Sequence, residues 1–249
     1  MNKTKTCTIL LLTFLLSLLA EFSNAQNSRF DGVRLFQSYF QDARITNSPY
    51  VNGNFLFADF DFVDLISLDA SGGYTITPKI EAEGSLGFIN VNPSFAESES
   101  GVSDLLLTGR YMFDVDVVDL AAGAFFELPI GTDDVGAGDF DFGFYGAIRH
   151  GLSDKIMLTG NLQANIIKTG GNDREFSLAV GLGSIINVSE RLNVIPELLL
   201  ESESDFTALS GGVDYRIKDI GHIRGALIVG VDDGAPDIGI TAGFLYPFN

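Results

Sequence analysis

The chain has 249 residues, a mean hydropathy of +0.23 and a formal net charge of −18 at pH 7. This acidity argues against nucleic acid as a partner, because the phosphate backbone binds basic surfaces. The positive hydropathy is not explained by a helical membrane protein either, since no apolar stretch after the N-terminus has the length of a spanning helix.

The N-terminus has the three parts of a secretory signal peptide. Lys3 and Lys5 precede an apolar run at 9–20, and the small-residue site Ser23-Asn24-Ala25 follows it. The run has roughly a dozen apolar residues, whereas a transmembrane helix needs about 20. We therefore predict a signal peptide at 1–25 and cleavage after its last residue.

The predicted signal peptide contains the only cysteine, Cys7. The mature chain of roughly 224 residues therefore has no thiol for a disulfide, a metal site or a lipid anchor, and its formal charge is −19. No linker or low-complexity tract divides it, so we expect one domain. We assign 26–50 to an N-terminal periplasmic segment and 51–249 to an outer-membrane β-barrel.

Alternating hydrophobicity supports the barrel. In the segment after Lys155, the apolar residues Ile156, Leu158, Leu162, Ala164 and Ile166 share one parity, and the polar residues Thr159, Asn161, Gln163 and Asn165 share the other. Successive strand side chains point to opposite faces, so one face of this strand is apolar and one is polar. A soluble sandwich gives similar alternation, and the lengths of strands and connections must distinguish the two.

Eleven segments fit strands of barrel length. They are 65–75, 79–90, 101–113, 117–129, 139–150, 155–168, 175–187, 191–203, 205–217, 221–232 and 237–248. Short turns between them, such as 77–79 and 188–190, alternate with longer acidic connections. Outer-membrane barrels have short periplasmic turns, longer outer loops and an even number of strands, so we place a twelfth strand at 52–62. The predicted fold is all-β: a transmembrane antiparallel up-and-down barrel of about 12 strands, with 10 or 14 as alternatives.

Side chains on the outward and inward faces of the predicted strands lead to separate predictions. Aromatic residues on the apolar parity near strand ends should form lipid-facing girdles: Phe88, Tyr111, Phe113, Phe140, Phe142, Phe176, Tyr215, Phe244, Tyr246 and Phe248. The last strand, 237–248, must also pair with the first, because lipid leaves no water for an open strand edge.

Charged residues of the inward parity are the candidate selectivity residues. They are Glu81, Glu83, Arg110, Asp141, Arg149 and Glu197. If they line a gap, the protein passes small solutes, and their negative sum favours cations or neutral compounds over anions. If they pair across strands and close the bore, the barrel is a structural or ligand-binding surface barrel that does not conduct. A pairing of Arg110 with Glu81 or Glu83 fits the antiparallel register.

The connection at 131–138 and its flank form a possible cation-binding loop, with Asp133, Asp134 and Asp139 as ligands. Its spacing does not match an EF-hand, and the alternative is that these are solvated loop charges. Acidic loops can also share divalent ions with lipopolysaccharide phosphates. We expect contacts with outer-membrane lipid and lipopolysaccharide, and with the barrel-assembly machinery during insertion.

Catalytic signals are weak. His150 lies three residues before Ser153, which faintly resembles the His/Ser pair of barrel lipid hydrolases, but the pair sits at a predicted periplasmic turn. The second histidine, His222, is far away in the chain, so a histidine metal site lacks ligands. We predict no enzyme, no catalytic residue, no metal and no cofactor.

Several short motifs resemble those of a known family. Gly101-Val102-Ser103-Asp104-Leu105 leads into Gly109-Arg110-Tyr111, Glu127-Leu128-Pro129-Ile130-Gly131 precedes an acidic loop, and Gly234-Ala235-Pro236-Asp237 opens the last strand. Their order over 65–249 is similar to outer-membrane barrels grouped under the meta-pathway of phenol degradation. The resemblance implies a porin-like or transporter-like barrel, often presumed to pass aromatic or small hydrophobic compounds. The final Asn249 departs from it, since such barrels commonly end on an aromatic residue.

Overall fold

The computed structural model describes residue 30 and residues 32–133, 135–136, 138–168, 174–202 and 205–248. The predicted signal peptide at 1–25 lies outside these described residues, as does the C-terminal Asn249. Among the residues described, there is no helix with the length and hydropathy needed to cross a membrane.

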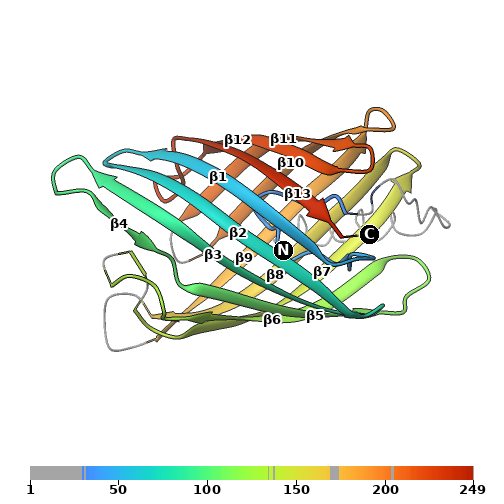
Figure 1. Cartoon of the computed structure of the whole chain (residues 1–249), viewed down its shortest axis with the longest axis horizontal. Helices are drawn as coiled ribbons and strands as arrows, with labels where there is room; N and C mark the ends of the chain where they lie inside the picture. The colour runs from blue at the N-terminus through green and yellow to red at the C-terminus, as the bar shows by residue number, and fades with distance from the viewer. Residues whose placement is uncertain are drawn as a thin grey trace, which may run out of the picture.

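The described chain is built almost entirely of strands (Figure 1). They are β1 Tyr50–Phe60, β2 Val63–Thr77, β3 Ile80–Pro93, β4 Glu99–Val102, β5 Leu105–Phe113, β6 Asp119–Leu128, β7 Asp141–Ser153, β8 Ile156–Lys168, β9 Arg174–Asn187, β10 Leu192–Glu201, β11 Phe206–Ile217, β12 Gly221–Gly230 and β13 Ile238–Pro247. Each predicted strand, including the one expected at 52–62, is present within a few residues of its expected bounds.

The strands form one closed antiparallel barrel. Strands that follow one another in the chain pair with each other, apart from β4 and β5, and β1 pairs with β13. Both β4 and β5 pair with β3, one after the other along its length, so they occupy a single strand position interrupted at Ser103 and Asp104. The barrel therefore has twelve strand positions, which confirms the predicted fold class and strand number.

Closure by the last strand is also confirmed. Ten residue pairs join β1 to β13, from Tyr50 opposite Pro247 to Asp59 opposite Ile238. On its other side β13 pairs with β12, from His222 opposite Leu245 to Ile228 opposite Gly239. No edge of β13 is left without a partner strand, as a barrel wall in lipid requires.

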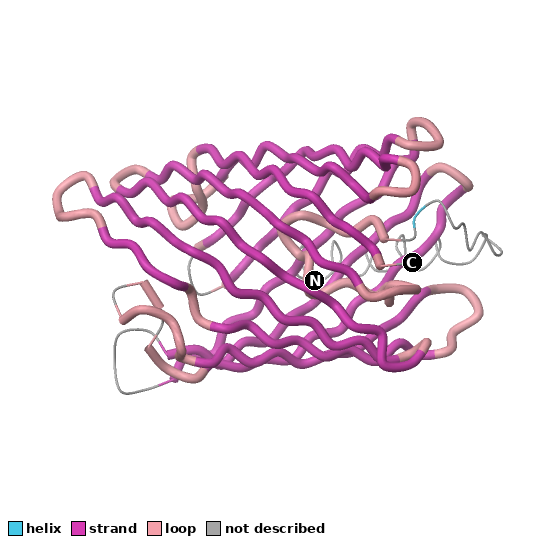
Figure 2. The backbone as a smooth tube through the Cα atoms, in the orientation of Figure 1, coloured by secondary structure: helices cyan, strands magenta, loops and turns pink. Residues whose placement is uncertain are grey.

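Figure 2 shows the strands of the wall, and the alternation predicted from the sequence separates the two faces of that wall. In β8, Leu162 is 55% exposed, whereas Asn161 is 7% and Asn165 is 6% exposed. The polar parity thus faces the barrel interior and the apolar parity faces outward. The outward aromatics include Phe88, Tyr111, Phe113, Phe140, Phe176, Tyr215, Phe244, Tyr246 and Phe248, all exposed. The soluble-sandwich alternative, with these rings buried, is excluded.

The barrel has two unlike ends. One carries the tight turns after β2, β7, β9 and β11, together with the start of β1 and the end of β13, and we call it the turn end. The opposite end carries the connections at 94–98, 129–140 and 231–237, and we call it the loop end. In Figure 1 the β3–β4 connection marks the loop end at the left, and the label C marks the turn end.

Residues 32–49 lie inside the barrel, and we call them the plug. Val33 and Leu35 are 0% and 2% exposed, and they pack with Met157, Ile185 and Ile195 of the wall. Ala43 packs with Ala121 and Ala147 on β6 and β7. The expectation of a periplasmic segment over 26–50 thus does not describe residues 33–46, because their side chains find apolar and charged partners in the lumen. The buried core of this barrel lies between the plug and the wall.

Candidate functional site

The candidate site is the lumen with its plug. The plug leads into β1, whose first residue Tyr50 lies at the turn end, and its middle part turns back at 36–41. Glycines on the inner face make room for it. A Cβ atom on Gly212 would lie 2.3 Å from the Phe36 ring, and one on Gly183 would lie 2.8 Å from Leu35. The wall sequence is therefore fitted to the plug where the two approach most closely.

Arg34 is the most strongly bonded plug residue. Its guanidinium pairs with the carboxylates of Glu81 and Glu83 on β3, and all three residues are at most 4% exposed. Arg110 of β5 pairs with the same two carboxylates, at 2.9 Å from Glu81. The Tyr50 hydroxyl donates to Glu83. Two guanidinium groups thus neutralise two carboxylates, which is the condition for burying charges at tolerable cost.

Asp42 joins the plug to β7, three strand positions along the wall from β3. Its carboxylate accepts a hydrogen bond of 2.7 Å from Nε of Arg149 on β7, and a second guanidinium nitrogen completes a bidentate pair. The Asp42 carbonyl accepts a hydrogen bond of 2.8 Å from Arg110. Nearby, Arg44 pairs with Asp119 of β6 at 3.3 Å. Bidentate guanidinium–carboxylate pairs fix orientation as well as position.

The plug turns back at 36–41, which we call its apex, and this apex is held through its backbone. The N–H groups of Phe36 and Gln37 donate to the carboxylate of Glu197 on β10, at 2.9 and 3.3 Å. The Ser210 hydroxyl donates to the same carboxylate at 2.9 Å. Glu197 is 5% exposed, so its charge is stabilised mainly by these donors.

On β12, Arg224 donates to the carbonyl groups of Arg34 and Leu35, and its guanidinium lies 4.4 Å from the centre of the Phe36 ring. Asp214 of β11 lies beside it, with 3.3 Å between the guanidinium and carboxylate atoms. His222 shares that carboxylate through its Nδ1 at 2.8 Å.

Five of the six predicted selectivity residues surround the plug: Glu81, Glu83, Arg110, Arg149 and Glu197. The sixth, Asp141, lies apart from them near the loop end. It accepts hydrogen bonds from the Lys168 backbone at 3.0 Å and from Arg174 at 3.2 Å. The predicted pairing of Arg110 with Glu81 and Glu83 is present in the wall. In this structure all six are engaged by partner groups rather than open to a channel.

The possible cation-binding loop does not gather its predicted ligands. Asp139 pairs with Lys168 at 2.8 Å, Asp133 is exposed, and Asp134 lies outside the described residues. Within the described part of the chain, no group of three or more His, Cys, Asp or Glu side chains is arranged to hold a metal ion.

His150 and Ser153, which faintly resembled a hydrolase pair, make unrelated contacts in the structure. The His150 ring contacts the Val117 carbonyl at 3.3 Å, and the Ser153 hydroxyl accepts a hydrogen bond from the Lys155 N–H at 3.3 Å. His150 therefore contacts the β5–β6 connection, whereas Ser153 contacts the turn after β7.

The plug residues Arg34 and Asp42 were missed by the sequence analysis. A signal for them existed. The predicted lumen charges summed to a negative value, which requires cations from elsewhere, and the segment before the first strand contains Arg34 and Arg44. The same segment contains Phe36, Tyr39 and Phe40, an aromatic content that favours burial.

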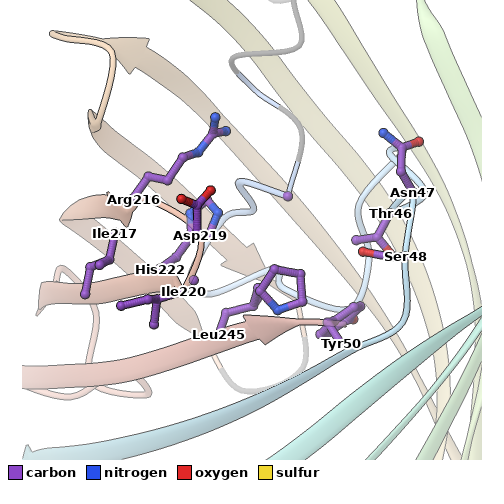
Figure 3. Close-up of a pocket in the computed structure, with 13 residues that line it drawn as sticks. Thr46, Asn47, Ser48, Tyr50, Arg216, Ile217, Asp219, Ile220, His222 and Leu245 are labelled. Carbon is purple, nitrogen blue, oxygen red and sulfur yellow. The ribbon is translucent and has the colours of Figure 1, made fainter. Parts of the chain in front are cut away.

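Two cavities border the plug. One, of about 290 Å³, opens at the turn end between the plug and the β11–β12 turn (Figure 3). Figure 3 shows Arg216, Asp219 and His222 on one side of it and Thr46, Asn47 and Ser48 on the other. The second, of about 220 Å³, lies between the plug apex and the wall formed by β13, β1, β2 and β3.

A family model described as "Putative MetA-pathway of phenol degradation" matches residues 32–248, which includes the plug as well as the barrel. The comparison with curated proteins gave no match.

Solved structures share the fold at low sequence identity. The COG4313 outer membrane channel from Pseudomonas putida F1 is 12% identical, with a TM-score of 0.69, over 90% of this chain and 100% of that one. The KdgM porin in complex with disordered oligogalacturonate is 10% identical, with a TM-score of 0.59, over 80% and 99%. The CymD monoaromatic hydrocarbon channel is 10% identical, with a TM-score of 0.51, over 83% and 90%. Each is an outer-membrane type of barrel.

Proposed function

The chain belongs to the family described as putative MetA-pathway of phenol degradation, and from that premise we propose that it is an outer-membrane barrel for passive passage of small solutes, closed by its plug. The observation that carries the proposal is the position of the plug. A segment of the same chain occupies the lumen of a wall that is itself complete, so the wall does not need the plug in order to close.

The contacts of the plug fit a removable closure. The polar ones include ion pairs and hydrogen bonds to side chains of β3, β7, β10 and β12, whereas Val33 and Leu35 make apolar contacts with the wall. No strand of the wall is contributed by residues 32–49. When the polar contacts of the plug break, water can replace the lost partner groups, because the lumen is then open at both ends. A barrel of twelve strands lies between small barrels filled by side chains and large water-filled porins, so the space vacated would be narrow.

The selectivity residues act in this proposal after the plug has moved. Glu81, Glu83, Arg110, Asp141, Arg149 and Glu197 would then line the path, with four carboxylates against two guanidinium groups. Cations and neutral compounds should pass more easily than anions. Reversal potentials that indicate anion preference would refute this assignment.

The turn end faces the periplasm in this proposal and the loop end faces outward, following the general rule for such barrels. Outer-membrane lipid then contacts the exposed apolar face, lipopolysaccharide contacts the acidic connections, and the barrel-assembly machinery inserts the chain. Small hydrophobic or aromatic compounds are one solute class to test, since CymD is a monoaromatic hydrocarbon channel. We propose no catalytic activity, since the similar solved structures are described as channels and a porin.

Planar-bilayer recording tests the proposal. Arg34→Gln removes the cation that the plug places between Glu81 and Glu83, and we expect larger or longer-lived conductance steps than in the wild type. Lys79→Gln is the matched control, because it breaks a lysine–aspartate pair with Asp114 on exposed turns outside the lumen. A wild type that already conducts steadily, at the level of Arg34→Gln, would contradict closure by the plug.

The second candidate is a non-conducting surface barrel that binds a ligand or partner through its acidic connections. The charge pairing around the plug favours it, because a bore filled in this way needs no gate. It predicts no conductance in either variant. It also predicts loss of binding when Asp133, Asp134 and Asp139 are neutralised together.

A further inference from the structure

The cavity of about 220 Å³ beside the plug apex has two chemically different sides. Phe36, Tyr39 and Phe40 of the plug form one side. Tyr39 and Phe40 meet edge to face, with ring centres 5.1 Å apart, so their positions are mutually fixed. This side offers apolar ring surface to an occupant.

Polar, uncharged side chains dominate the other side. They come from neighbouring strands: Asn52 and Asn54 of β1, Ser71 of β2, Ser85 of β3 and Thr241 of β13. Thr241 donates to the Asn54 side chain at 2.8 Å, and Asn52 donates to Ser71 at 3.3 Å. These bonds orient the amides and hydroxyls across the wall. Amides and hydroxyls each donate and accept hydrogen bonds, and so does the hydroxyl group of a solute.

The lining contains one carboxylate, that of Asp69, and one guanidinium, that of Arg224. Arg224 is already engaged by Asp214 and by the carbonyl groups of Arg34 and Leu35, and the Asp69 carboxylate repels an anion, so an anionic occupant is disfavoured. The Asp69 carboxylate accepts a hydrogen bond from Ser67 and can accept another from the hydroxyl group of a neutral occupant. The volume is below the roughly 300 Å³ at which drug-sized ligand sites begin, which limits the occupant to about a single ring.

From these features we infer that the cavity is a binding site for a neutral, polyhydroxylated ring of monosaccharide size, stacked on the plug aromatics and hydrogen-bonded to the β13–β3 wall. A ring with one hydroxyl fits less well. It would displace water from five polar side chains but form hydrogen bonds with only one or two of them, so it binds less tightly than a ring with several hydroxyl groups. The inference rests on the proposed function, since it names the solute class of the same lumen.

Binding by the full-length mature chain, refolded in detergent micelles, tests this inference. The probes are D-glucose, followed by saturation-transfer NMR, and 4-fluorophenol, followed by its fluorine signal with empty micelles as the blank. Asn54→Leu combined with Ser85→Ala removes two polar groups from the wall of the cavity. Gln163→Leu is the matched control, because it removes a lumen amide on β8 that does not border the cavity. Heat-modifiable gel mobility verifies that each variant is folded.

We expect saturable glucose binding in the wild type, a rise in Kd of about tenfold in the double variant, since each lost hydrogen bond contributes about 0.5–1.5 kcal/mol, and no change in Gln163→Leu. Saturable binding of 4-fluorophenol without glucose binding would overturn the inference in favour of a phenolic solute. Equal weakening by the two sets of substitutions would overturn it as well. The bilayer experiment on Arg34→Gln uses neither probe, so failure here and failure of the channel proposal can be told apart.

Discussion

Asp42 of the plug and Arg149 of β7 form a bidentate ion pair, and the two residues are 2% and 1% exposed. They are 107 residues apart in the chain, so the pair exists only because the plug is folded inside the barrel. Arg149 also donates to the carbonyl groups of Val33 and Phe30. One wall side chain therefore holds both the start of the plug, at Val33, and the segment after its turn, at Asp42.

This pair should be strongly coupled. Arg149→Gln leaves the Asp42 carboxylate buried without its cation, which typically lowers the free energy of unfolding by about 3–5 kcal/mol. Asp42→Asn likewise leaves the Arg149 guanidinium buried without its anion. The plug should then leave the lumen more often, and limited proteolysis of the folded barrel should cleave residues 32–49 faster. The double variant should lose less than the sum of the two single losses. Strict additivity would mean that the pair does not hold the plug.

Two adjacent glycines of β11 provide a steric test. A Cβ atom on Gly212 would collide with the Phe36 ring at 2.3 Å, whereas one on Gly211 meets nothing within 4 Å because it faces outward. Gly212→Val should therefore displace the plug apex and increase both proteolysis of the plug and bilayer conductance. Gly211→Val should behave as the wild type in both assays. The same response from both variants would point to a general weakening of β11 instead.

The wall could be predicted from the sequence because its physics is local and periodic. The alternation of Leu162 with Asn161 and Gln163 predicts which face of the strand contacts lipid, and the turn residues between strands indicate where each strand ends. Even the pairing of Arg110 with Glu81 and Glu83 follows from the register of neighbouring strands. The interruption between β4 and β5 did not follow, because it depends on the β6–β7 connection. There the Gly131 N–H donates to the Asp104 carboxylate at 2.8 Å.

The plug could not be placed in the same way. Arg34 and Asp42 have no periodic pattern around them, and their partners are distant in sequence: Glu83 is 49 residues from Arg34, and Arg149 is 107 residues from Asp42. Non-local pairing of this kind depends on the volume of the lumen inside the closed wall. That volume cannot be predicted from the sequence pattern. The inward position of the lumen charges follows from strand parity, but their partners in the plug do not.

The outward parity predicts a large cost for charge in the wall. Leu162 is 55% exposed and near the middle of β8, so Leu162→Arg places a guanidinium in the hydrocarbon at a cost of about 2–4 kcal/mol. Reversible unfolding by denaturant in lipid vesicles should show that loss of folding free energy. Gln163→Arg, one residue further and on the inner face, should cost clearly less, and a reversed order would contradict the assignment of the two faces.

Truncation at the C-terminus tests closure of the barrel. A chain ending after Asp233 lacks β13, and with it the ten pairs to β1 and the pairing with β12. Two open edges would then face lipid, where each unsatisfied backbone group costs several kcal/mol, so the truncated protein should fail to insert.

Shortening the connection at 131–138 removes only contacts such as the Thr132 bond to Val102 and leaves every β1–β13 pair intact, so this variant should insert. Heat-modifiable migration of the outer-membrane fraction measures both. A truncated protein that still migrates as a folded barrel would refute the requirement for β13, and a shortened-loop variant absent from the membrane would assign the β6–β7 connection a part in assembly.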